Sequence, residues 1–194
     1  IEQKRIGISH LQLDSGKFYL KSYKEGGTNL QFIVDYFTPK SPTPKVKKKP
    51  YEITLNKVVL NNISFKYRNF SRNNALKRIN FDDIDLYNLS TSIVGLDTRK
   101  HLFNAQVNQL TFKEKSGFHL KNLTTQAIID SNKMEFKKLL LQTPHSEVGD
   151  YLLLKYSRFS DFKEFVSKVR VNMHLRQSKL HTKDISFFAD ATKN

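Results

Sequence analysis

The sequence predicts a mainly β protein, an elongated and strongly twisted antiparallel sheet that curls into an open groove and carries two short helices. Three observations predict this fold. One strand-like spacing of apolar residues recurs along the chain, and only two short stretches carry helical spacing instead. Apolar residues also make up only 38% of the sequence, against roughly 45–50% in an average domain. Such a chain can cover one face of a sheet but is lean for a deep, two-sided core.

The recurring spacing is clearest between Ile53 and Tyr67. Its apolar residues form two pairs, Ile53 with Leu55 and Val58 with Leu60, separated by two polar residues. Side chains two positions apart in a strand share a face, whereas the doubled spacer changes face once. A β-bulge, or a tight link between two strands, would return both pairs to the same side.

The same spacing appears in several other parts of the chain. Phe118, Leu120 and Leu123 give a partial copy. This repetition favours a repeated strand unit, although an antiparallel sandwich of alternating strands would also produce part of it. The full copies are Ile6, Ile8, Leu11 and Leu13; Ile79, Phe81, Ile84 and Leu86; Ala105, Val107, Leu110 and Phe112; and Met134, Phe136, Leu139 and Leu141.

Other stretches depart from this spacing. Helical spacing after a capping residue predicts short helices over Leu30–Phe37 and Arg158–Val166, with a strand as the alternative for each. Between them, residues 38–50 hold four of the five prolines and a lysine cluster, which predicts a loop. Strand alternation is clear again in Val169–Leu175, and Ile185–Phe188 is the last predicted strand.

Composition narrows the function classes. The net charge of +15 suits either an anionic partner such as nucleic acid or a lipid surface, or lysines that keep strand surfaces soluble. The chain has no cysteine and no apolar run long enough to span a membrane. We treat residues 1–194 as one β segment. Its start at Ile1 without a signal peptide leads us to expect a fragment of a longer chain.

The sequence predicts no catalytic residue, no metal site and no cofactor. His145, Ser146 and Glu147 resemble a catalytic triad in composition only, because adjacent residues of an extended chain point apart. Asp83 and Asp85 are expected to share one strand face, but no third ligand for a cation lies nearby. We therefore interpret them as part of a solvated face.

Nucleic-acid binding is not expected either. Phe65 and Tyr67 would share one face of a strand, whereas Lys66 and Arg68 would take the other. A stacking platform for bases needs aromatic and basic side chains on the same face. A nucleic-acid-binding β domain remains only a secondary alternative.

A sheet with one apolar face must hide that face by closing, by pairing or by curling into a trough. In a trough, an acyl chain would gain about 0.8 kcal/mol for each buried methylene without needing a tight pocket. The residues predicted to line such a groove and contact lipid are Ile53, Leu55, Val58, Leu60, Phe65, Phe81, Ile84, Leu86, Val107, Leu110, Phe112, Phe118, Met134, Phe136, Leu139, Leu141, Val171 and Met173.

Several segments resemble one protein family. They are Ile53–Tyr67, Phe81–Leu89, Leu110–Leu123 and Leu139–Val148, with Phe112–Phe118 and the Thr143–Ser146 turn as the most specific parts. They resemble the translocation and assembly module (TamB) family, within the AsmA-like superfamily of Gram-negative cell envelopes. The resemblance covers most of residues 6–188 and places the chain near the family's N-terminal part.

The resemblance implies a β-groove that crosses the periplasm and passes phospholipid between the inner and outer membranes. It also implies an inner-membrane anchor that this chain lacks, and an outer-membrane barrel partner in membrane-protein assembly. The family has no catalytic residues to transfer, so only the apolar face maps onto this sequence. The alternative is a structural or scaffold β subunit of an envelope translocation or assembly complex.

Overall fold

The computed structural model describes residues 5–31, 52–71, 78–100 and 102–188, without the side chains of residues 53 and 163–166. It confirms a mainly β fold: one ten-stranded sheet that does not close into a barrel. The strand order is β1-β3-β4-β5-β7-β8-β9-β10, with β2 beside β3 and β6 beside β5. The strands are β1 (Arg5–Asp14), β2 (Lys17–Ser22), β3 (Glu52–Asn69), β4 (Asp83–Asp97), β5 (Phe103–Glu114), β6 (His119–Leu120), β7 (Asn122–Ile129), β8 (Lys133–Gln142), β9 (Glu147–Lys155) and β10 (Arg170–His174).

The sheet is mixed: most strand pairs are antiparallel, as predicted, but one edge of the sheet is parallel. β1 and β2 both run parallel to β3, and the other pairs are antiparallel. β1 and β2 lie end to end along β3, with Ser15 and Gly16 between them. A Cβ on Gly16 would lie 3.2 Å from Cδ1 of Ile63, so a larger residue would crowd this join. Residues 23–51 supply the long connection that a parallel neighbour requires.

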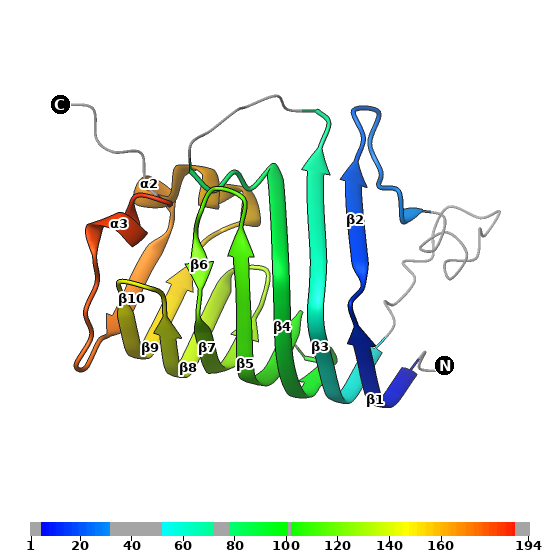
Figure 1. The fold of residues 1–194 in the computed structure, drawn as a ribbon, viewed down its shortest axis with the longest axis horizontal. Helices are drawn as coiled ribbons and strands as arrows, with labels where there is room; N and C mark the ends of the chain where they lie inside the picture. The colour runs from blue at the N-terminus through cyan, green and yellow to red at the C-terminus, as the bar shows by residue number, and fades with distance from the viewer. Residues whose placement is uncertain (1–4, 32–51, 72–77, 101, 189–194) are drawn as a thin grey trace.

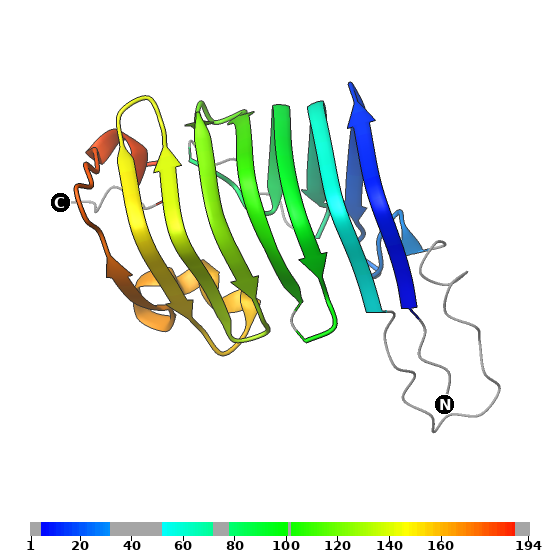
Figure 2. The ribbon, with the colours of Figure 1, turned by 90° about the horizontal axis from the view of Figure 1, so that it is seen from below.

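The sheet is a single bent layer. Figure 1 shows β3, β4 and β5 rising from a bend along the lower margin of the sheet, and Figure 2 shows the strands crossing the underside. Among the described residues, the sheet ends at β10 on one side and at β1 with β2 on the other. The short helices gather at the β8–β10 end (Figure 1).

In two copies of the spacing, a β-bulge lies in the doubled spacer, as predicted. In β8 the register shifts between Lys137 and Leu139, and Lys138 has a φ of 51°. In β5, Gln109 pairs with Ser92 and Val107 with Ile93, which leaves Asn108 as the extra residue. Each bulge absorbs one residue of the doubled spacer, so the apolar pairs on either side return to one face.

β3 departs from the predicted place of the bulge. Its pairing with β4 runs from Leu55 to Leu60 without a shift, and the irregularity follows at Asn62, where φ is 52°. Leu55 and Val58 are nevertheless both buried. Gly95 of β4, with a φ of 67°, lies opposite the spacer between them.

The predicted helices and the last predicted strand have different outcomes. Arg158–Val166 overlaps a 3₁₀-helix, Phe159–Glu164, that continues into α2 (Phe165–Lys168). Nearly all of Leu30–Phe37, and the whole of the predicted loop 38–50, fall outside the described residues. The predicted strand Ile185–Phe188 was wrong, because this segment contains the end of helix α3 (Thr182–Ile185) and a turn.

Candidate functional site

The strand register places many apolar residues of the repeated spacing on one face of the sheet, here called the apolar face. Residues directly opposite in neighbouring strands point to the same side. One such row crosses five strands: Leu11 of β1 lies beside Val58 of β3, followed by Ile93 of β4, Val107 of β5 and Thr125 of β7. Apart from its terminal threonine, the row is aliphatic.

Two further rows extend the apolar face to the other edge of the sheet. Both begin on β5 and run across β7, β8 and β9 to β10. Together with the first row they make the face continuous from one edge strand to the other. The rows are Ala105, Ala127, Phe136, Leu152 and Met173, and Phe103, Ile129, Met134, Leu154 and Val171.

The predicted groove-lining residues differ in exposure according to their place in the sheet. Phe81 was wrongly placed in a strand, since it precedes β4 and its side chain is 60% exposed. At the β10 edge, Val171 and Met173 are 39% and 47% exposed. The side chain of Ile53 is outside the described part. Buried residues are Leu55, Val58, Val107, Phe118 and Leu139; partly buried ones are Leu60, Phe65, Ile84, Leu86, Leu110, Phe112, Met134, Phe136 and Leu141.

Two residues lie deep in the apolar face without having been predicted there. Ile63 is only 1% exposed, and its spacing after Leu60 repeats the doubled spacer, so the sequence carried a signal for it. Glu114 is also 1% exposed. Its carboxylate accepts hydrogen bonds from the backbone N–H groups of Asp85 and Ser116. No spacing rule distinguishes such a buried acid from a solvated one.

An aromatic cluster closes one end of the apolar face. The ring of Phe118 lies 5.6 Å from Phe187 and 5.1 Å from Phe188, both edge-on, and 6.0 Å from Phe112. Phe118 also belongs to a buried core with Ile79 and Leu120. The segment after α3 therefore covers part of the surface that the sequence predicted to be open.

Buried Asp184 of α3 holds this C-terminal segment in place. Its carboxylate accepts hydrogen bonds from the hydroxyl groups of Thr143, at 2.7 Å, and Ser146. The Ser146 hydroxyl in turn accepts a hydrogen bond from the backbone N–H of His181. The turn after β8 is thus engaged in anchoring α3, and the hydroxyl of Ser146 is directed to a carboxylate rather than to an imidazole.

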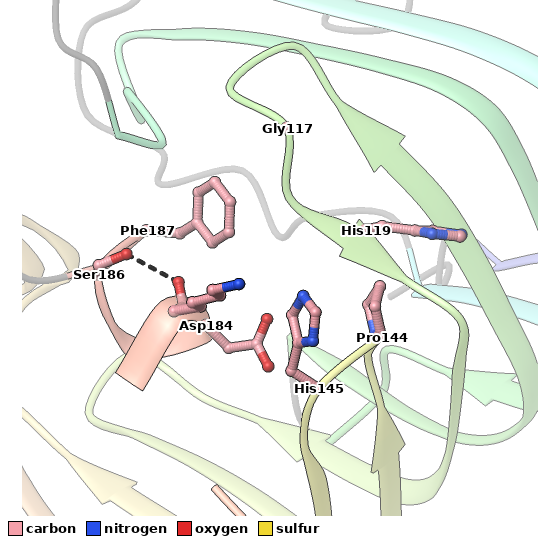
Figure 3. A pocket seen from close by; sticks show the side chains of 8 residues that line it. Gly117, His119, Pro144, His145, Asp184, Ser186 and Phe187 are labelled. Carbon is pink, nitrogen blue, oxygen red and sulfur yellow. Dashed lines mark hydrogen bonds between the residues drawn. The ribbon is translucent and has the colours of Figure 1, made fainter. Parts of the chain in front are cut away.

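A small pocket lies between the β5–β6 hairpin, the β8–β9 turn and α3 (Figure 3). It has a volume of about 240 Å³. The backbone C=O of Lys183 accepts a hydrogen bond from Ser186 at its margin (Figure 3). The lining residues are Gly117, His119, Pro144, His145, Lys183, Asp184, Ser186 and Phe187. Its size suits a small group rather than an acyl chain.

Charged side chains occupy the opposite, outer face of the sheet. Asp83 pairs with Arg68 at 2.9 Å and also with Lys115, and Asp85 pairs with Lys66 at 3.1 Å. The hydrogen bond from Arg68 is the main cause of the lowered pKa of Asp83. The register places Asp83 and Asp85 on one face of β4, as predicted, and it also places Arg68 and Lys66 of β3 directly opposite them. Asp83 and Asp85 are therefore held in ion pairs with neighbouring basic side chains.

Comparison with protein-family models, curated proteins and solved structures found no match. Within the described ranges, no helix has both the length and the apolar character needed to cross a bilayer. The His, Asp and Glu side chains of those same ranges form no group that could hold a metal ion. The apolar face is thus the largest feature available for a functional interpretation.

Proposed function

We propose that this chain is a segment of a lipid-transfer conduit, with the apolar face as the wall that contacts acyl chains. The observation that carries the proposal is the exposure of the apolar face at the β10 edge of the sheet. Val171 and Met173 on β10 are 39% and 47% exposed. A face that served only as a core would be covered at its margins, whereas exposed apolar surface suits an apolar partner.

The direction of the rows supports the same proposal. Together they cross the strands from β1 to β10, so an acyl chain along them would meet apolar side chains from successive strands. Each buried methylene contributes about 0.8 kcal/mol wherever it lies. Affinity is thereby spread along the wall, which favours movement of lipid over retention in one pocket. In this proposal, the bent sheet forms an open groove whose wall is the apolar face.

The resemblance to the TamB family indicates which molecule would be carried and in which compartment. On that basis we propose phospholipid as the cargo and the periplasm as the compartment, between an inner-membrane anchor outside this sequence and an outer-membrane barrel partner. The mechanism is non-catalytic. The conduit would support outer-membrane biogenesis by supplying lipid along a continuous apolar wall.

Phospholipid bound to the purified chain tests the proposal. We expect native mass spectrometry to detect phospholipid on the chain after incubation with vesicles and removal of the vesicles. Met173→Asp should lower the bound fraction at least severalfold, because a carboxylate would interrupt two-residue apolar spacing at an exposed edge. Asn172→Asp is the matched control on the outer face of the same strand, and it should leave lipid binding unchanged.

A scaffold β subunit is the second candidate, favoured by the cover that Phe187 and Phe188 place over Phe118. A chain that folds normally and binds no phospholipid in this experiment would support the scaffold and contradict the conduit.

A further inference from the structure

Three basic residues lie directly opposite one another on the outer face of β8, β9 and β10. Lys155 of β9 is the partner of Lys133 on β8 and of Arg170 on β10. Each is next in sequence to a residue of the apolar face, so all three point to the other side. We call Lys133, Lys155 and Arg170 the basic ladder.

The charges of the basic ladder are only partly compensated. Lys133 lies 3.5 Å from the carboxylate of Glu135, which also lies 3.4 Å from Lys137. That carboxylate accepts a further hydrogen bond from the Tyr151 hydroxyl. Lys155 and Arg170 form no ion pair with any side chain that the structure describes. Like charges directly opposite in a sheet destabilise it, so an external anion here would relieve their repulsion.

The surroundings of the basic ladder fit a flat anionic surface. Neighbouring strands lie about 4.8 Å apart, so the three charges span about 10 Å across the sheet. The next row on the same face contains the apolar residues Ile128 and Leu153 on either side of Glu135. The chain's net charge of +15 adds long-range attraction toward an anionic partner.

We propose that the basic ladder docks on an anionic phospholipid membrane by contacting lipid phosphate groups. Basic and apolar side chains on one face match a bilayer surface, which presents both phosphate and hydrocarbon. A nucleic acid fits less well, because bases need aromatic platforms. The nearby rows contain no Phe or Trp. They offer the Tyr151 ring, whose hydroxyl is held by Glu135, beside the imidazole of His174. This docking does not require that the apolar face carry lipid.

Vesicle flotation with the whole chain tests this docking. We expect binding to phosphatidylcholine vesicles that contain phosphatidylglycerol, little binding to phosphatidylcholine alone, and weakening with salt. The double variant Lys155→Gln/Arg170→Gln should bind anionic vesicles roughly 25-fold more weakly, about fivefold for each charge removed. The control is Lys17→Gln/Lys57→Gln, which removes two exposed charges that have no basic residue of the ladder opposite them.

Two results would overturn the membrane proposal. One is an equal loss of vesicle binding in both double variants, since net charge rather than the basic ladder would then control binding. The other is a loss of single-stranded RNA binding in Lys155→Gln/Arg170→Gln while vesicle binding stays unchanged. Phospholipid retained by the chain reports the apolar face and flotation reports the basic ladder, so the two proposals fail separately.

Discussion

Asp184 is the residue whose side chain does most to hold the C-terminal segment against the sheet. It is buried, and its carboxylate accepts hydrogen bonds from two hydroxyl groups on the turn between β8 and β9. Removing the acceptor leaves the hydroxyls of Thr143 and Ser146 without this partner. Leaving buried polar groups unsatisfied costs more than the hydrogen bonds themselves contribute.

We predict that Asp184→Ala lowers the free energy of unfolding by about 2–3 kcal/mol, measured by urea denaturation. Asp184→Asn should cost less, because the amide oxygen keeps one acceptor. Asp14→Ala is the control, since that carboxylate accepts hydrogen bonds from Gln12 and Asn61 at the exposed edge of the sheet. Equal losses for Asp184→Ala and the control would show that Asp184 does not anchor α3.

At the scale of the strand, bulges convert an irregular apolar spacing into a one-sided face. The φ of Lys138 is 51°, in the left-handed region. That conformation costs an L-residue roughly 1–2 kcal/mol, and β-branched residues tolerate it least. The bulge in β8 therefore depends on a residue without a branched Cβ at this position.

We predict that Lys138→Val lowers the free energy of unfolding by about 1–2 kcal/mol, whereas Lys138→Gly is neutral or stabilising. Lys137→Val is the matched control, because it introduces the same side chain one position earlier, outside the left-handed region. Thermal or urea unfolding of the variants measures the difference. If both valine variants were equally stable, the positive φ would not determine the bulge.

The strands and two bulges follow from the spacing of apolar side chains and were predictable. The direction of strand pairing at one edge and the conformation of the C-terminal segment were not. Alternation and doubled spacers gave the strands and the bulges of β5 and β8. The parallel pairing of β1 and β2 with β3 was not predictable, because successive side chains point to opposite faces in parallel and antiparallel strands alike. The segment Ile185–Phe188 is too short to distinguish a strand from a helix, and a contact of Asp184 with a distant turn decides its conformation.

In the candidate site, too, some features were predictable from local spacing and others were not. The spacing of apolar residues predicted that Phe136 and Met173 lie on one face of the sheet. The strand register confirms it. The burial of Glu114 and the cover over Phe118 depend on residues that are distant in sequence, so no local pattern indicates them. The exposure of Phe81 was missed for the same reason, since its spacing matches the copies but it lies before the strand.

At the scale of the whole molecule, a single layer separates two surfaces of different chemistry. Apolar rows together extend over one face from β1 to β10, and ion pairs and the basic ladder occupy the other face. This division makes lipid contact and membrane docking physically separate. If the apolar face carries lipid, acyl chains must contact one side of each strand and not the other.

Site-specific photo-crosslinking along β10 tests that requirement most directly. A photoreactive residue would be placed at each of Val171, Asn172, Met173 and His174 in the purified chain, which would be loaded with phospholipid and freed of vesicles so that membrane docking of the outer face does not contribute. Adducts would be identified by mass spectrometry. We predict phospholipid adducts at Val171 and Met173 and few at Asn172 and His174, a two-residue period along the strand. Equal labelling at all four positions, or protein adducts alone at Val171 and Met173, would contradict lipid contact at the apolar face.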